Sequence, residues 1–284
     1  MSEPSQHFYR SQGLNLAYWT WGDTALPPLV LMHGGRDHAR TWDRIAEAFC
    51  DSYHVVAPDL RGHGDSDWCP GSHYPLIDHV PDLITLISLL GGRVPVVGHS
   101  FGSAVTMIAA GGFPDKFTKI VDIEGSAPLM QQELPITPER LRKWTEDTLK
   151  MDAQTPRLYP SFEAAATRMR EANEYLTEEQ ALHMARWGAR EVEGGWTWKF
   201  DPRAGGRALA DVRPEHIDKI WAEVTAPVLH LVGRKSRFGN ATFRGRLLEA
   251  YFKNSRTAVI EDSGHWLHHE QLDATVHAIR IFLA

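Results

Sequence analysis

The chain has 284 residues, of which 43% are hydrophobic and 23% are charged. This composition is that of an ordinary globular protein, and it excludes a disordered, collagen-like or coiled-coil chain. A formal net charge of −6 leaves no excess of Lys and Arg to neutralise a phosphate backbone, so nucleic acid is not expected as a partner.

The first elements along the chain are strands. Residues 7–10 and 14–19 flank the turn residue Gly13 and predict a hairpin. Short apolar runs without polar alternation then follow, as is typical of strands in a parallel sheet that is buried on both faces. These runs are residues 28–32, 53–57, 94–97, 119–123, 227–232 and 257–260.

Helical patterns separate these strands. They lie at residues 41–49, 78–90, 101–110, 240–251 and 272–282. Strands that alternate with helices predict an α/β fold with a doubly wound, mostly parallel sheet. Between residues 129 and 223 the alternation stops, and we find helical periodicity, tryptophans and no convincing buried strand. We therefore predict a core domain of residues 1–128 and 224–284 and an inserted helical cap, or lid, of residues 129–223.

Three features bear on the compartment. Cys50 and Cys69 are too few to staple a chain of this length, and we expect reduced thiols. No apolar run approaches the roughly 18 residues that span a bilayer, and the first ten residues are polar and lack a signal-peptide pattern. We expect a cytoplasmic protein that makes no membrane contact.

The most informative motif is the sequence GHSFG at residues 98–102. It follows an apolar strand and precedes a helical pattern, which is the context that a G-x-S-x-G nucleophile turn requires. Ser100 would lie at a helix N-terminus, where free N–H groups favour developing negative charge. The motif predicts that Ser100 is a nucleophile. The alternative is a glycine-rich turn that only lets the helix pack closely on the sheet.

A second motif, His33-Gly34-Gly35, directly follows an earlier strand. Acyl transfer needs two N–H donors that stabilise the oxyanion, one from the residue after the nucleophile and one from such a loop. We predict that the N–H groups of Gly35 and Phe101 form this oxyanion hole. His33 is expected to fix the loop by hydrogen bonds rather than to act in catalysis.

A third motif, DSGHW at residues 262–266, follows the last predicted strand. A serine hydroxyl is a weak nucleophile at neutral pH and needs a general base whose pKa lies near the working pH, which points to histidine. His265 is predicted as this base, at the same edge of the sheet as Ser100. His268 and His269 are expected to lie on the helix that follows.

These motifs together resemble the α/β-hydrolase superfamily, and in particular its capped serine hydrolases of the esterase or lactonase kind. In chain order they are HGG at residues 33–35, Trp42, PDLRGHGDS at 58–66, GHSFG at 98–102 and SGHW at 263–266. The resemblance covers nearly the whole chain. It implies a serine nucleophile, a histidine base, an acid that orients the histidine, no cofactor or metal, and a substrate pocket between sheet and cap. It also implies that the loop at residues 58–66 is a hydrogen-bonded scaffold.

The chain departs from the family at the acid. Most members carry it in a G-x-x-D pattern after the strand that is here residues 227–232, but this sequence reads GRKS and places Ser236 there. Some members carry the acid one strand earlier, where Glu124 stands. Glu124 is therefore the predicted acid. Asp122, which we expect on the other face of its strand, and Asp262, which is close to His265 along the backbone, remain alternatives.

Five tryptophans lie in the predicted cap, namely Trp144, Trp187, Trp196, Trp198 and Trp221. Aromatic side chains there are expected to line a pocket for an apolar or aromatic acyl or alcohol group. We predict that Trp187, Trp196 and Trp198, together with Trp266 beside His265, bind the substrate. The alternative is that these tryptophans hold the cap helices to the core.

The sequence thus predicts a cofactor-independent serine hydrolase that cleaves a small-molecule carboxylic ester or lactone through an acyl-enzyme on Ser100. Two alternatives remain: a carbon–carbon bond hydrolase that uses the same triad, and a non-catalytic ligand-binding homologue that lost its acid. Epoxide hydrolases and dehalogenases need a carboxylate nucleophile, which Ser100 excludes. The sequence leaves the oligomeric state open.

Overall fold

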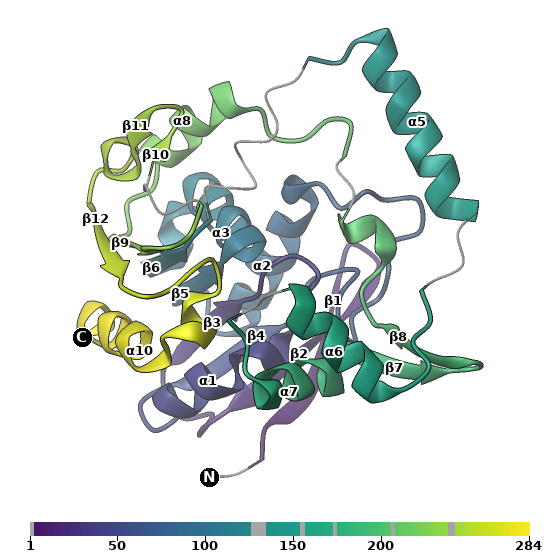
Figure 1. Ribbon diagram of the computed structural model, residues 1–284. Helices are drawn as coiled ribbons and strands as arrows, with labels where there is room; N and C mark the ends of the chain where they lie inside the picture. Colours follow the sequence, from purple (N-terminus) through teal and green to yellow (C-terminus); the bar gives the residue numbers. More distant parts are fainter. Residues whose placement is uncertain (1–2, 126–134, 154–156, 173–174, 206–207, 238–241) are drawn as a thin grey trace.

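The computed structural model describes residues 3–125, 135–153, 157–172, 175–205, 208–237 and 242–284. Its centre is an eight-stranded sheet in the order β1-β2-β4-β3-β5-β6-β9-β12 (Figure 1). The strands are β1 Ser5–Ser11, β2 Leu14–Trp21, β3 Pro28–Met32, β4 His54–Pro58, β5 Val94–His99, β6 Phe117–Ile123, β9 Val228–Gly233 and β12 Ser255–Ile260. The hairpin β1–β2 joins β4 antiparallel, and all further pairings are parallel. The predicted doubly wound, mostly parallel sheet is confirmed.

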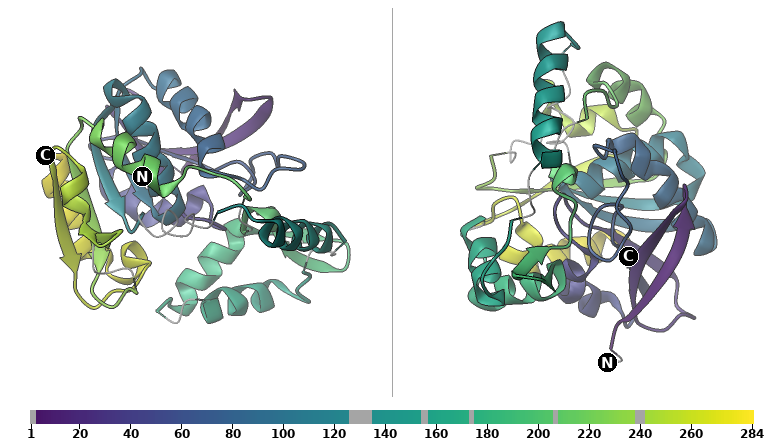
Figure 2. Two further views of the ribbon diagram at one scale, coloured as in Figure 1. Left: turned by 90° about the horizontal axis from the view of Figure 1, so that it is seen from above. Right: turned by 90° about the vertical axis from the view of Figure 1, so that its right-hand side faces the viewer.

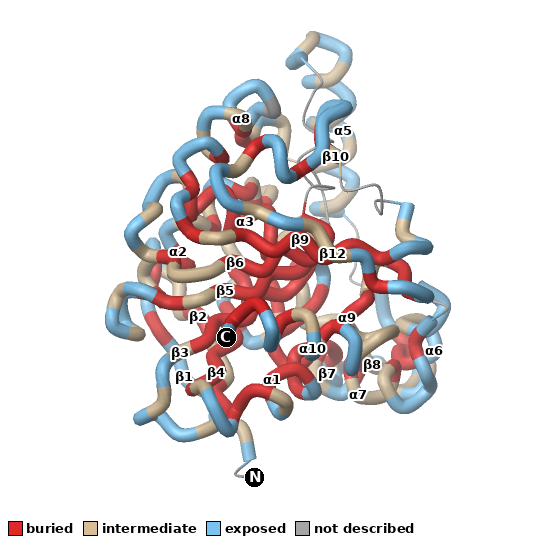
Figure 3. The backbone as a smooth tube through the Cα atoms, turned by 90° about the vertical axis from the view of Figure 1, so that its left-hand side faces the viewer, coloured by how far each residue is buried: buried red, intermediate tan, exposed pale blue. Residues whose placement is uncertain are grey.

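The central strands form because their residues are apolar on both faces. Every residue of β4 and of β9 is buried, and the tube drawing shows β5, β6 and β9 running through the buried centre (Figure 3). Strands of this kind need helices on both sides to exclude water. The continuous apolar runs in the sequence therefore correspond to the middle of the sheet, not to its edges.

Helices cover both faces of the sheet. One face packs against α2 Leu76–Leu89, α3 Ser100–Gly112 and α8 Pro214–Ala222, and the other against α1 Asp43–Phe49 and α10 Leu272–Leu283. The shorter helices are α9 Leu267–Glu270 and the 3-10 turns Ala39–Trp42, Pro114–Lys116, Pro202–Gly205 and Leu248–Tyr251. No helix in the described ranges is both long and apolar enough to cross a membrane.

The strand order sets the place of a ligand site. From β3 the chain crosses to β4 on one side, and from β5 it continues to β6, β9 and β12 on the other. In open α/β sheets the crevice at such a reversal, outside the carboxyl ends of the strands, is where ligands bind. The loops after β3 and β5 meet at this crevice.

A long insertion separates β6 from β9. It contains α5 Pro138–Ala153, α6 Phe162–Ala172, α7 Glu178–Gly188 and the antiparallel pair β7 Ala189–Val192 and β8 Gly195–Trp198. Helices α6 and α7 lie against each other and near the pair, whereas α5 projects beyond the rest of the molecule (Figure 2). The sequence predicted no convincing buried strand in this stretch, and the short strands β7 and β8 each bury only one residue, Ala189 and Thr197. Gly194 and Gly195, with φ of 87° and 143°, form the turn.

The last part of the insertion packs differently. Helix α8 lies on α3, and Trp221, which the sequence assigned to the predicted cap, is fully buried against Phe243, Tyr251 and Phe252. This tryptophan therefore belongs to the core. The predicted cap boundary at residue 129 lies outside the described residues.

The prediction of a helix at residues 240–251 was also wrong. Residues 240 and 241 lie outside the described residues, and the following segment forms the antiparallel pair β10 Thr242–Phe243 and β11 Arg246–Leu247. Between these strands Arg244 and Gly245 have left-handed φ values of 46° and 74°, which a helix does not permit. Only Leu248–Tyr251 turns, as a 3-10 helix.

Candidate active site

Ser100 lies at a sharp turn between β5 and α3. It has a φ of 48°, in the left-handed region that side chains other than glycine rarely adopt. The turn needs its flanking glycines, because a Cβ on Gly98 would lie 2.6 Å from the Ser103 Cα and one on Gly102 would lie 2.4 Å from the His33 carbonyl oxygen. The chain therefore holds Ser100 at the N-terminus of a helix, at the carboxyl edge of the sheet.

The loop after β3 packs directly on this turn. A Cβ on Gly34 would lie 3.5 Å from the Ser100 Cβ, and one on Gly35 would lie 3.8 Å from the Phe101 Cβ. His33 fixes the loop, since Nδ1 donates to the Gly34 carbonyl at 2.7 Å and Nε2 accepts from the Leu60 N–H at 2.9 Å. Burial holds the pKa of His33 well below its usual range, so the ring is neutral and can accept that bond.

Glu124 directly follows β6 and has a left-handed φ of 55°. It is 3% exposed, and protein groups meet both carboxylate oxygens. Oε1 accepts from the Gly233 N–H at 2.8 Å, while Oε2 accepts from the Ser236 hydroxyl at 2.6 Å and lies 3.0 Å from His265 Nδ1. Ser236, at the position where the resemblance led us to look for the acid, therefore binds the carboxylate that follows β6.

Two further residues hold the His265 loop, and sequence reasoning missed both. His99, directly before Ser100, donates from Nε2 to the His265 carbonyl at 3.0 Å. The Glu270 carboxylate accepts from the N–H groups of Gly264 and, at 3.1 Å, Trp266. His99 stands inside the GHSFG motif, so its position was visible in the sequence, but its partner lies far along the chain.

The other two acids considered lie elsewhere. Asp122 accepts from the Ser103 hydroxyl, from the Gly125 N–H at 2.8 Å and from His230 Nδ1 at 2.6 Å. These contacts engage both of its oxygens. Asp262 is exposed, and its carboxylate lies 3.0 Å from Lys235 Nζ.

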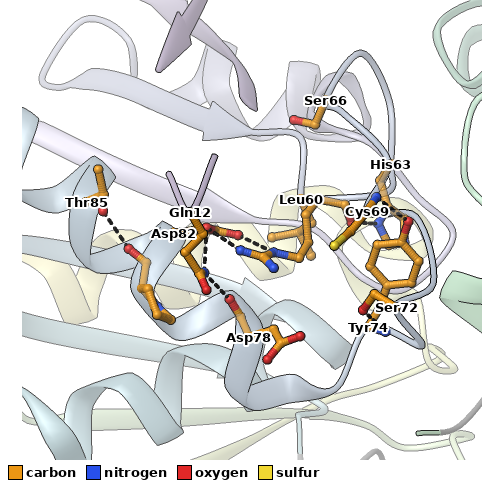
Figure 4. Close-up of polar contacts among 12 residues, drawn as sticks. Gln12, Leu60, His63, Ser66, Cys69, Ser72, Tyr74, Asp78, Asp82 and Thr85 are labelled. Carbon is orange, nitrogen blue, oxygen red and sulfur yellow. Dashed lines mark hydrogen bonds and ion pairs between the residues drawn. The ribbon is translucent and has the colours of Figure 1, made fainter. Parts of the chain in front are cut away.

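The loop at residues 58–66 is held by buried polar contacts. Arg61 and Asp82 form a two-pronged ion pair at 2.7 and 2.8 Å, and Gln12 also donates to Asp82 (Figure 4). Asp59 accepts from the N–H groups of two other residues, and burial raises its pKa to about 6. His63 Nε2 accepts from the Arg36 N–H at 3.0 Å. These contacts match a scaffold that supports the loop after β3.

A cavity of about 490 Å³ opens beside the loop after β3. Gly35 of that loop and Trp266, next to His265, line it. Trp198 also lines it. The other two tryptophans that were expected to bind substrate pack elsewhere. Trp187 contacts the ring of Trp19 and the guanidinium of Arg40, and Trp196 contacts the ring of Phe162. Sequence reasoning missed the arginines that line the cavity, because they come from separate elements.

Within the described ranges, no group of three or more His, Cys, Asp or Glu side chains is arranged to hold a metal ion. A neutral or protonated imidazole beside a buried carboxylate can take up and return a proton at its other nitrogen.

The sheet order and the serine turn are those of an α/β-hydrolase fold. A model of the alpha/beta hydrolase family matches residues 29–278, and the chain belongs to this family. It is 25% identical to a serine hydrolase-like protein of Danio rerio over 275 residues, which are 93% of this chain and 83% of the relative. It is 27% identical to Esterase YbfF of Escherichia coli strain K12 over 260 residues, 90% of this chain and 92% of the relative. These relatives support hydrolase activity.

Solved structures agree on the fold. The thioesterase domain from the curacin biosynthetic pathway has a TM-score of 0.87 and 21% identity, with 99% of this chain and 100% of that chain covered. Because the identity is low, this likeness concerns the fold alone.

Proposed function

We propose that the protein is a serine hydrolase that cleaves a carboxylic ester or lactone, with Ser100 as nucleophile, His265 as general base and Glu124 as the acid. The observation that carries the proposal is the 3.0 Å contact between His265 Nδ1 and the buried Glu124 Oε2. Because this contact supplies the carboxylate that Ser236 lacks, it argues against a degenerate, non-catalytic homologue.

In the proposed acylation, Ser100 Oγ attacks the substrate carbonyl carbon while its proton passes to His265 Nε2. The imidazolium keeps its Nδ1–H on Glu124, whose negative charge stabilises it. The N–H groups of Gly35 and Phe101 receive the oxyanion. When the tetrahedral intermediate collapses, the carbon–oxygen bond to the alcohol breaks and His265 Nε2 gives its proton to the departing alcohol.

Deacylation repeats these steps with water. His265 Nε2 takes one proton from water as the oxygen attacks the acyl-enzyme carbonyl. The bond to Ser100 Oγ then breaks, and the serine recovers its proton from His265. The balance is one ester and one water consumed, and one carboxylic acid and one alcohol released; a lactone yields a single hydroxy acid.

We also propose that the insertion forms the cap of this site. Its support is the cavity, whose lining combines Trp198 of β8 and residues of α6 with Gly35 and Trp266 of the sheet edge. A substrate in this cavity would lie between the insertion and the proposed oxyanion hole. The predicted limits of residues 129–223 would then be shortened at the end, since α8 packs on α3.

The test is the rate at which a fluorophosphonate probe labels the purified protein, with Ser100→Ala as the variant and Ser103→Ala as a matched control on the same helix. We expect rapid labelling of the wild type and of the control and none of Ser100→Ala. In this reaction Ser100 Oγ attacks the phosphorus atom and the phosphorus–fluorine bond breaks. Fluoride leaves, and the serine proton passes to His265. Folded wild-type protein that stays unlabelled would overturn the proposal and favour the binding-protein alternative.

A screen of para-nitrophenyl esters and of lactones then separates ester hydrolysis from carbon–carbon bond cleavage. Turnover of esters with release of nitrophenolate supports the proposal. A labelled serine that turns over no ester or lactone but cleaves a vinylogous diketone would assign the same residues to carbon–carbon hydrolysis.

A further inference from the structure

The cavity beside Gly35 carries an unusual set of charges. Four arginines line it, and none of its lining residues in the described ranges is Asp or Glu. The whole chain has 36 Asp and Glu against 30 Lys and Arg, so acidic side chains are the more common type. A cavity that has only positive charges in an acidic protein is suited to attract an anion.

The four arginines come from different parts of the fold. Arg36 follows the proposed oxyanion residue Gly35, Arg157 lies between α5 and α6, Arg168 is on α6 and Arg190 is on β7. Three of the four belong to the insertion. The charge therefore does not result from one basic segment, since the fold brings separate segments around one volume.

These side chains lack strong carboxylate partners. Among the described residues, Arg36, Arg157 and Arg190 take part in no ion pair, and Arg168 has only a 3.4 Å contact with the exposed Glu171. Arg157 lies 5.1 Å from the ring of Tyr159, and Arg190 lies 5.6 Å from that of Trp68. A guanidinium that stacks on a ring keeps its N–H donors available for a planar anion.

Arg36 is held in place through its backbone. Its N–H donates to His63 at 3.0 Å, and its φ of 61° is in the left-handed region. The supporting loop at residues 58–66 thus fixes the arginine that is nearest in sequence to the proposed oxyanion hole. This link between the scaffold and the cavity fixes the backbone of an arginine that lines the cavity, one residue after Gly35.

We propose that this cavity selects substrates that carry an anionic group, a carboxylate or a phosphate, on the acyl chain of the ester. The inference rests on the proposed function and names its substrate class. The aromatic lining of Trp68, Trp198, Phe200 and Trp266 receives the apolar part of the acyl chain, and the arginines receive its charged end. Arginine binds carboxylate and phosphate oxygens through paired N–H bonds.

The test compares three para-nitrophenyl esters with the same chain length: pentanoate, hydrogen glutarate and phosphonobutanoate. We expect kcat/KM to be about tenfold or more higher for an anionic ester than for pentanoate, because each charge-assisted contact contributes to binding. Preference for glutarate identifies a carboxylate, and preference for phosphonobutanoate identifies a phosphate-like group. Equal rates for all three esters would overturn the inference.

The double variant Arg157→Gln/Arg190→Gln locates the effect. It should lower the ratio of kcat/KM for the preferred anionic ester to kcat/KM for pentanoate by about tenfold, through the KM of the anionic ester. Arg170→Gln, on the exposed side of α6, is the matched control and should change neither rate. A double variant that behaves like this control would overturn the inference.

Failure of the proposed function and failure of the anion-site inference give different results. If fluorophosphonate labels Ser100 and pentanoate is hydrolysed without any preference for an anion, only the present inference fails. If Ser100 is not labelled, the proposed function fails, and calorimetric titration of the Ser100→Ala protein with free glutarate and with phosphate still tests the cavity. Binding that weakens in the double arginine variant supports an anion site, and absence of binding to both anions rejects it.

Discussion

The proposed reaction centre and the arginine-lined cavity lie side by side but are built differently. At the centre, the Glu124 carboxylate is buried and protein groups meet each of its oxygens. In the cavity, guanidinium groups on exposed or half-exposed residues take part in few ion pairs. At the reaction centre, polar groups form hydrogen bonds with other protein groups. In the cavity, the arginine N–H donors are available to a ligand.

This difference separates the two tasks. Buried hydrogen bonds that come from strand ends fix a geometry that does not depend on the substrate. Substitutions of the charged residues on the insertion can change which substrate is preferred without disturbing that geometry. Variants at the centre should therefore act on kcat, and variants in the cavity should act on KM.

The largest effect is expected from Glu124→Gln. The amide retains an acceptor but cannot stabilise the imidazolium of His265, so kcat should fall by about a thousandfold or more, as it does when a triad acid becomes an amide. The melting temperature should change little. Steady-state kinetics with a para-nitrophenyl ester measures the loss.

Asp262→Asn is the matched control for that variant. Asp262 is exposed and pairs with Lys235, so the same loss of charge should leave kcat within about twofold. If Asp262→Asn were the inactive variant and Glu124→Gln the active one, the assignment of the acid would be wrong.

A smaller effect is expected at Ser236, where the loss of a hydrogen bond can be compared with the gain of a charge. Ser236→Ala removes the 2.6 Å bond to Glu124 and should lower kcat by about threefold to tenfold. Ser236→Asp places a second carboxylate against Glu124, so the pair would share a proton at neutral pH and kcat should fall by about a hundredfold. The pH–rate profile should shift upward for Ser236→Asp alone. Equal rates for both variants would contradict the contact.

The buried histidines of the core predict how stability depends on pH. Burial lowers the pKa of each, to about 4 for His38 and His63, so they stay neutral in the folded protein. The set is His33, His38, His63, His79, His99 and His268. Below pH 6.5 the unfolded chain binds more protons, so the free energy of unfolding should fall as the pH falls from about 6.5 toward 4. Urea unfolding at a series of pH values measures this.

His268→Leu sharpens that prediction. Neither ring nitrogen of His268 has a hydrogen-bond partner among the described residues, and the side chain is 2% exposed. An apolar replacement should reduce the acid-side slope by up to about 1.4 kcal/mol per pH unit, the contribution of one proton. An acid-side slope in His268→Leu equal to that of the wild type would contradict the prediction.

The smallest effect concerns salt. The cavity arginines are partly open to solvent, so their attraction for an anionic ester is screened, and kcat/KM for that ester should fall by about threefold between about 20 mM and 500 mM sodium chloride. Hydrolysis of the pentanoate ester should not follow this trend. If both esters responded alike, salt would be acting on the centre and not on the cavity.

Much of the centre could be predicted because its motifs are local. Ser100, His265 and Gly35 each lie in a short segment that follows a strand, and carboxyl ends of parallel strands meet at one edge. Glu124 was predicted from the family resemblance, because some members carry the acid after the corresponding strand. The role of Ser236 could not be predicted. A serine at the expected acid position shows that a charge is missing there, but it does not show that the serine hydroxyl binds the Glu124 carboxylate after the neighbouring strand.

The parts that the sequence did not predict depend on long-range packing or on turns. Phe243, Leu247 and Tyr251 are four residues apart, as on one face of a helix, but Arg244 and Gly245 turn the chain there. The arginines of the cavity come from segments that only the folded insertion brings together, and periodicity carries no information about such contacts.

One consequence of the backbone concerns engineering. Ser100 and Glu124 both have left-handed φ values, 48° and 55°, at the ends of neighbouring strands. Such conformations cost about 1 kcal/mol or more for residues other than glycine. A mutant library screened for heat resistance alone would therefore enrich glycine at position 100 and discard the reacting hydroxyl. At position 124, the loss of the buried bonds to Gly233 and Ser236 opposes the same change. A useful screen of this protein has to score turnover together with survival at high temperature.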